Sequence, residues 1–83
     1  MTEISAAIAT LGQLLREVMS DPPETFDPDG DMIDELGLSS VDVMEVISLV
    51  EDTWDIAFPL NDLASIRTIR QLAERILVLG TAS

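Results

Sequence analysis

Three stretches of the chain repeat apolar residues at the three- and four-residue spacing of an amphipathic helix. In residues 4–19 this stripe consists of Ile4, Ala7, Ile8, Leu11, Leu14, Leu15 and Val18. In residues 40–55 it consists of Val43, Val46, Ile47, Val50 and Trp54. After Thr68 it consists of Ile69, Leu72, Ala73, Ile76 and Leu79. Side chains at this spacing share one face of a helix, so the repeat predicts three helices that each bury one face.

Prolines and capping residues predict where these helices begin and end. The segment "DPPETFDPDG" holds three of the four prolines and stops the first helix, whose start Thr2 or Ser5 could cap. Ser39 and Asp42 resemble a capping box, and Thr68 with Gln71 has the T-x-x-Q form of one. At the other end of the last helix, we expect the glycine at position 80 to act as the stop.

The segments between the helices are expected to pack on the core. Residues 20–38 form a long connection, for which the expected anchors are Phe26, Ile33, Leu36 and Leu38. Pro59 ends the second helix, and residues 60–66 are expected to form a short helical turn whose inward residues are Leu60, Leu63 and Ile66. No segment alternates long enough to predict a strand. The fold class is therefore all-α: a small four-helix bundle of three longer helices and one short helix, with a long first loop, in a single domain over residues 1–83.

The charge is concentrated in the middle of the chain. Residues 17–66 hold fourteen carboxylates and no lysine or arginine, within a formal net charge of −12. Nucleic acid is a poor partner for such a surface, because binding it requires basic side chains that neutralise phosphates. The surface favours proteins with basic patches, unless the acids serve only to keep the protein in solution.

The residue types of common catalysts are missing. The chain has no histidine, lysine or cysteine, so Ser39 and Ser40 have no imidazole to take a proton, and we expect no enzymatic activity. No apolar run reaches the ~20 residues that span a bilayer, and Glu3 does not suit the basic start of a signal peptide. We therefore expect a cytoplasmic protein that binds no membrane and is a monomer when free.

The acidic segment "DPDGDMIDE", residues 27–35, raises the question of calcium binding. An EF-hand loop requires acids at positions 1, 3 and 5, glycine at position 6 and glutamate at position 12. Counted from Asp27, position 6 is Met32 and position 12 is Leu38; counted from Asp29, position 5 is Ile33. Both registers fail, so we interpret the segment as a solvated acidic turn and predict no metal site.

Two adjacent serines open the second predicted helix. One serine suffices as the N-cap, which leaves the other in the first turn beside backbone N–H groups without partners. Such N–H groups and the helix dipole favour a phosphate. The residues alone thus make Ser40 a better phosphate acceptor than catalyst, while a purely capping role stays open for Ser39 and Ser40.

From Met32 to Ile76 the chain resembles acyl carrier and peptidyl carrier proteins. In that family the serine of an L-G-x-D-S-L pattern carries 4′-phosphopantetheine, and residues 36–41 here read L-G-L-S-S-V. "EDTWDIAFP" is similar to the family's acidic helix end, aromatic residue and proline, and "TIRQLAERI" to its final helix. The resemblance places the modified serine at Ser40, with Ser39 instead of aspartate and Val41 instead of leucine. The G-L-S-S variant also resembles discrete carriers of amino acids.

The resemblance implies a discrete carrier protein. A phosphopantetheinyl transferase would attach the arm from coenzyme A to Ser40, and a ligase would load an acyl or aminoacyl group on its thiol as a thioester for downstream acyl-processing enzymes. The residues expected to contact these partners are Leu38, Ser39, Val41, Asp42, Glu45, Glu51, Asp52 and Asp62. The alternative is a non-catalytic acidic interaction domain in which Ser40 is never modified.

Overall fold

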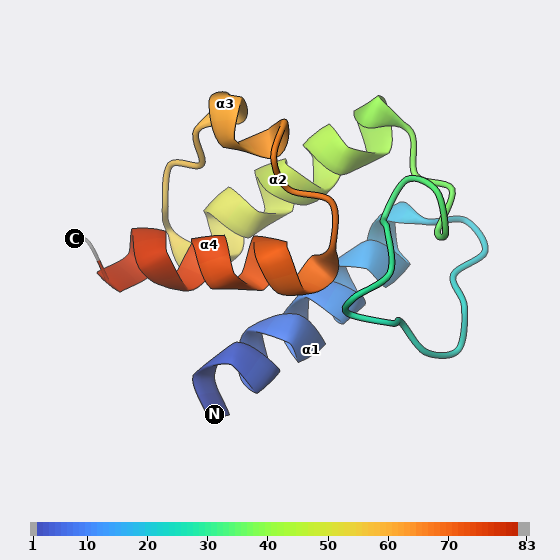
Figure 1. Ribbon diagram of the computed structural model, residues 1–83, viewed down its shortest axis with the longest axis horizontal. Helices are drawn as coiled ribbons and strands as arrows, with labels where there is room; N and C mark the ends of the chain where they lie inside the picture. Colours follow the sequence, from blue (N-terminus) through green and yellow to red (C-terminus); the bar gives the residue numbers. More distant parts are fainter. Residues whose placement is uncertain (1, 82–83) are drawn as a thin grey trace.

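Three amphipathic helices and one short helix surround a single core. The computed structural model describes residues 2–81, and the helices of that part are α1 (Thr2–Val18), α2 (Ser40–Trp54), α3 (Leu60–Leu63) and α4 (Ile69–Thr81). Helix α1 packs against both α2 and α4, while α3 lies beyond α2 and α4 at the far side from α1 (Figure 1). The described residues form no strand, only an isolated bridge between Asp31 and Thr68. The predicted all-α bundle is confirmed.

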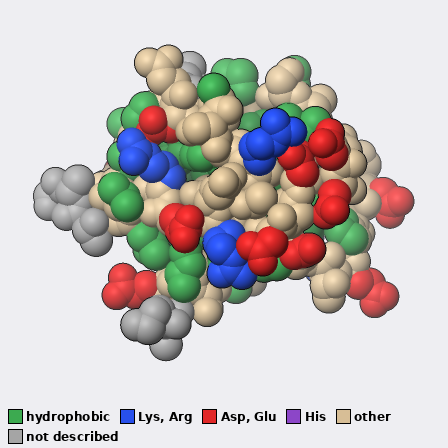
Figure 2. Space-filling view, in the orientation of Figure 1, with side chains coloured by type: hydrophobic (Ala, Val, Ile, Leu, Met, Phe, Trp, Pro, Cys, Tyr) green, Lys and Arg blue, Asp and Glu red, His purple; other side chains and the backbone are tan. Residues whose placement is uncertain are grey.

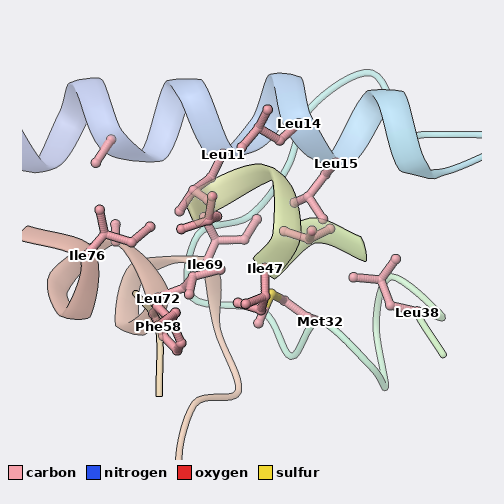
Figure 3. Packing of buried hydrophobic residues seen from close by; sticks show 14 residues of the cluster. Leu11, Leu14, Leu15, Met32, Leu38, Ile47, Phe58, Ile69, Leu72 and Ile76 are labelled. Atoms are coloured by element: carbon pink, nitrogen blue, oxygen red, sulfur yellow. The ribbon is translucent and has the colours of Figure 1, made fainter. Parts of the chain in front are cut away.

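The core forms where the predicted apolar stripes meet (Figure 3). Its fully buried members come from α1, α2 and α4 and include Leu11, Leu15, Val50, Ile69 and Ile76. The remaining stripe residues are either buried or half-buried against this cluster. Each fully buried side chain of this size contributes about 1.5–3 kcal/mol, so the three stripes hold the helices together.

Both predicted capping boxes are confirmed. The hydroxyl of Ser39 accepts a hydrogen bond from the N–H of Asp42 at 3.1 Å, and the Asp42 carboxylate accepts one from the N–H of Ser39 at 3.2 Å. At the start of α4, the Thr68 hydroxyl accepts from the N–H of Gln71 at 3.1 Å, and the Gln71 side chain accepts from the N–H of Thr68 at 3.2 Å. These bonds satisfy N–H groups that a helix start otherwise leaves without partners.

Some predicted helix ends are displaced. Helix α1 begins at Thr2, so Ser5 lies inside it, and α4 continues through Gly80 to Thr81. The prediction that Gly80 stops α4 is wrong, because Gly80 does not take the positive φ that a left-handed glycine cap requires. The residue with that conformation is Asp55, at φ 53°, which caps α2. The side chains of Thr2 and Leu60, for which a cap and an inward position were predicted, lie outside the described part of the structure.

The long connection between α1 and α2 packs on the core as expected, with one exception. Met32 and Leu38 are buried, and Phe26 and Leu36 are half-buried against the cluster. Ile33 was predicted to be an anchor, but 53% of its surface is exposed. The carboxylate of Asp31 accepts hydrogen bonds from the N–H groups of Ile33 and Asp34, at 2.8 and 2.9 Å, and the resulting turn places Met32 inside and Ile33 outside.

Candidate functional site

Ser40 is the first residue of α2, and its side chain is exposed. Gly37 has φ 74°, a conformation that suits glycine, and its N–H donates to the carbonyl oxygen of Ile33 at 3.0 Å. The next residue, Leu38, is buried, which anchors the chain immediately before the helix. The turn at Gly37 and the anchor at Leu38 therefore fix the position from which Ser40 points to solvent.

The two serines occupy different chemical environments. The hydroxyl of Ser39 is engaged in the capping box, whereas the hydroxyl of Ser40 forms no hydrogen bond with any described residue. The backbone N–H groups of Ser40 and Val41 also lack a partner within the described residues. A phosphate ester on Ser40 would lie beside these N–H groups and the positive end of the helix dipole, so the residues present fit such a group.

An apolar cavity of about 380 Å³ lies beside Ser40. Its floor consists of buried side chains from all sides of the bundle: Leu15, Met32, Leu38, Val46, Ile47 and Leu72. Its mouth is formed by exposed lining residues, among them Ile33, Ser40 and Met44. A dry 150 Å³ cavity binds benzene, so by the same ratio this cavity has room for about fifteen non-hydrogen atoms.

Asp31 and Arg67 are the charged residues in the lining of this cavity. Nε of Arg67 lies 2.7 Å from Oδ2 of Asp31, and its Nη2 lies 3.7 Å from Oδ2 of Asp34. Hydrogen bonds from the N–H of Asp34 and from the Arg67 guanidinium hold the pKa of Asp31 below its usual value. A second pair joins Arg70 Nε to Asp29 at 2.7 Å and lowers the pKa of Asp29 in the same way.

Basic groups lie directly against acidic groups on the face shown in Figure 2. Three of the five acids of "DPDGDMIDE", namely Asp29, Asp31 and Asp34, thus form ion pairs with Arg67 and Arg70. Among the described residues, no group of three or more acidic or histidine side chains is close enough to hold a metal ion. In the same part of the chain, none of the helices has the length and apolar character needed to cross a membrane.

The structure separates the predicted partner contacts into two groups. Val41 is 65% exposed, and Ser39, Glu45 and Asp52 are also exposed, as a contact surface requires. Leu38 is only 3% exposed, so it lines the cavity and cannot form part of an outer contact surface.

Three predicted contact acids already have partners inside the molecule. Asp42 belongs to the capping box of α2, and Glu51 accepts a hydrogen bond from the N–H of Phe58 at 2.9 Å. Asp62 lies 2.6 Å from Nη2 of Arg75. These carboxylates support the fold, and each is less available to a partner than Glu45 or Asp52.

Sequence reasoning missed Met44 and Arg67. Met44 is 53% exposed and lines the cavity mouth. Helical spacing could have found it, because it follows Ser40 by four residues and Val41 by three. Arg67 offered no such signal, because its partner Asp31 lies 36 residues away in sequence.

The fold and the site define a class of small helical proteins with an exposed serine at the start of a helix, beside an apolar cavity. A family model described as "Phosphopantetheine attachment site" matches residues 9–76. The chain belongs to this family, as an acyl carrier protein, and its prosthetic group is covalently attached 4′-phosphopantetheine.

Individual relatives agree with this assignment. An acyl carrier protein of Syntrophobacter fumaroxidans is 26% identical over 70 residues, which cover 84% of this chain and 86% of the relative. One from Rhodococcus erythropolis is 34% identical over 62 residues, covering 75% and 68%. The crystal structure of an acyl carrier protein from Thermotoga maritima matches with a TM-score of 0.81 at 25% identity, covering 93% of this chain and 89% of that one.

Family membership sets the general role of the chain. Acyl carrier proteins are non-catalytic, so the chain is a carrier and not an enzyme. The family implies interaction with a phosphopantetheinyl transferase and with acyl-processing enzymes. The predicted carrier role and cofactor are thereby confirmed.

Proposed function

We propose that Ser40 is the residue that carries 4′-phosphopantetheine. The observation that supports this assignment is the free, exposed hydroxyl of Ser40 at the start of α2, next to the unpartnered N–H groups of Ser40 and Val41. Ser39 is the neighbouring alternative, but its hydroxyl is held by the N–H of Asp42. Modification of Ser39 would remove a cap, whereas modification of Ser40 leaves the cap intact.

Attachment requires little of the carrier itself. The hydroxyl oxygen of Ser40 would attack the phosphorus next to the pantetheine of coenzyme A, the bond from that phosphorus to the nucleotide phosphate would break, and the nucleotide would leave. The serine proton would go to a base of the transferase, because the chain has no histidine, lysine or cysteine. The N–H groups of Ser40 and Val41 would then hold the phosphodiester. When bound, the arm supplies a thiol that holds cargo as a thioester.

The cargo that the cavity supports best is an apolar acyl chain. Apart from Asp31, Ser40 and Arg67, its lining is entirely apolar, and it begins at the residue that bears the arm. A protonated amino group would lose its hydration there without a dedicated partner, which is costly. We therefore favour an acyl chain as the cargo over an amino acid, which is the alternative that the G-L-S-S pattern suggested.

Partner enzymes are proposed to dock on the exposed face of α2 next to Ser40. This face offers two apolar residues, Val41 and Met44, and two acids, Glu45 and Asp52, whose carboxylates have no hydrogen-bond or ion-pair partner among the described residues. A partner with an apolar patch bordered by arginine or lysine fits this combination. A ligase that loads the arm, a single domain, a cytoplasmic location and a monomeric free state stay predictions.

Modification in vitro tests the attachment site. The full chain is incubated with coenzyme A, magnesium and a broad-specificity transferase, and its mass is measured before peptide mapping. Wild type should gain one phosphopantetheine on Ser40, Ser40→Ala should gain none, and Ser39→Ala should still be modified. Mapping of the group to Ser39 would contradict the assignment to Ser40, and no modification by several transferases would contradict it in favour of the unmodified interaction domain.

Loading with two cargoes tests the cargo class. The modified chain carries either an octanoyl or an alanyl thioester, and thermal unfolding of each is compared with that of the unloaded form. A cargo that enters the cavity binds the folded state but not the unfolded state, and it therefore raises the melting temperature. The octanoyl group should raise it and the alanyl group should not; the reverse order would reassign the carrier to amino acids.

A further inference from the structure

One wall of the cavity is attached to the rest of the molecule through Arg67. This wall consists of Asp31, Met32 and Ile33, from the long connection before α2. A second, adjoining part of the lining includes Leu63, Ala64, Ile66 and Arg67, from α3 and the segment after it. The two parts are far apart in sequence, so the bonds between them decide whether the cavity keeps its shape.

Arg67 forms these bonds with both its side chain and its backbone. Its Nε donates to Oδ2 of Asp31 at 2.7 Å, and its Nη2 lies 3.7 Å from Asp34. Its carbonyl oxygen accepts a hydrogen bond from the N–H of Met32 at 2.8 Å. The three consecutive residues of the wall are thus held at Asp31 and Met32, while Ile33 projects at the exposed mouth.

Arg70 provides a matched comparison within the same structure. Its Nε donates to Asp29 at 2.7 Å, and its N–H donates to the carbonyl oxygen of Pro28 at 2.9 Å. Both arginines therefore attach neighbouring parts of the same connection through the guanidinium group and through one backbone hydrogen bond. They differ in position, because Arg67 and Asp31 line the cavity whereas Arg70 and Asp29 do not.

We infer that Arg67 is a positioning residue that holds the wall of residues 31–33 closed and thereby sets how fast an apolar molecule leaves the cavity. This inference rests on the proposed carrier function only for its biological meaning, because the cavity exists in the unmodified chain. The side chain of Arg67 is exposed, so solvent and salt weaken its attraction to Asp31. The ion pair between Arg67 and Asp31 is therefore weak enough to open while the core stays intact.

The consequence for a carrier is control of cargo release. Met32 is buried and belongs to the core, so the wall cannot leave as a whole. Separation of Arg67 from Asp31 frees the outer part of the wall, where Ile33 borders the mouth. Cargo inside the cavity would then escape faster, although the helices and their caps remain in place.

Release of a neutral apolar dye, N-phenyl-1-naphthylamine, tests this inference on the full unmodified chain. The dye is bound, and its loss of fluorescence is followed by stopped flow after dilution. Arg67→Gln should release the dye about threefold faster than wild type at low salt, as expected for loss of one exposed ion pair. Arg67→Lys should give an intermediate rate because it keeps the charge, and the matched Arg70→Gln should release at the wild-type rate.

Salt provides the second measurement. At 1 M salt the Debye length is only about 3 Å, so wild type should release the dye nearly as fast as Arg67→Gln. Far-UV circular dichroism and thermal unfolding verify that the variants are folded, and the two glutamine variants should melt at similar temperatures.

Three results would overturn the inference. These are equal release rates for Arg67→Gln and Arg70→Gln, a rate for Arg67→Lys no slower than that of Arg67→Gln, and no binding of the dye to wild type. Because Ser40 is unmodified throughout, a failure of the proposed attachment site would leave this result standing, and the two failures are distinguishable.

Discussion

Asp42→Lys is expected to lower the melting temperature of this carrier, whereas Glu45→Lys should leave it nearly unchanged. The Asp42 carboxylate accepts a hydrogen bond from the N–H of Ser39 and lies in the first turn of α2. Loss of that bond costs about 0.5–1.5 kcal/mol, and a cation at the positive end of the helix dipole adds about 1 kcal/mol. The sum, about 2 kcal/mol, corresponds to roughly 10 °C for a domain of this size.

Glu45 has no comparable role in the fold. It is exposed and forms no hydrogen bond or ion pair with any described residue. Its replacement should change the free energy of unfolding by less than about 0.5 kcal/mol. Glu45→Lys should instead slow modification of Ser40 by a transferase and weaken the salt dependence of that rate, as expected for a charge on a docking surface.

The assay combines thermal unfolding by circular dichroism with the rate of modification at two salt concentrations. Glu3→Lys, on α1, controls for the change in net charge, and Asp42→Asn separates loss of the carboxylate from addition of a cation. A melting temperature of Asp42→Lys equal to that of wild type would refute the capping argument. Equal modification rates for Glu45→Lys and Glu3→Lys would refute the docking face on α2.

Three further predictions concern stability. Asp55→Gly should raise the free energy of unfolding by about 0.5–1 kcal/mol, measured by urea titration, because it relieves the left-handed backbone and removes a negative charge at the end of α2. Leu11→Ala should cost about 2–5 kcal/mol in the same titration, whereas Val78→Ala, at a residue 54% exposed, should change it by less than about 0.5 kcal/mol. Stability should fall below about pH 4: the lowered pKa values of Asp29 and Asp31 stabilise the fold above their unfolded value of 3.8, and this contribution is lost as the pH drops through the folded values. A melting temperature that does not decrease below about pH 4 would contradict the last of these.

The helices and caps were predictable because their signals are local. Apolar spacing identified the stripes that form the core, and the pairs Ser39–Asp42 and Thr68–Gln71 identified the starts of α2 and α4. The end of α4 was missed at Gly80, because a glycine near a helix end allows a left-handed cap without requiring one.

The cavity was not predictable, because its walls come from parts of the chain that only long-range packing brings together. Leu38 shows the difficulty: its position before Ser40 suggested an outer contact, yet the turn at Gly37 directs it into the core. Asp62 shows it again, because its partner Arg75 lies on α4 and no local pattern relates the two. The resemblance of L-G-L-S-S-V to the family pattern therefore led to the prediction that Ser40 is the attachment site, while the roles of the surrounding acids required the structure.

The contacts of the arginines explain why the negative charge on the exposed face of α2 is not neutralised within the chain. Each of the four is already in contact with another part of the chain: Arg16 with the backbone of Glu24 and the ring of Phe26, and the other three with Asp31, Asp29 and Asp62. These contacts hold connecting segments and α3 in place, and none of them lies on α2, which contains no basic residue. Because all four arginines have partners elsewhere in the chain, neutralisation of Glu45 and Asp52 must come from outside. The charge of the proposed docking face thus follows from where the arginines are needed for folding.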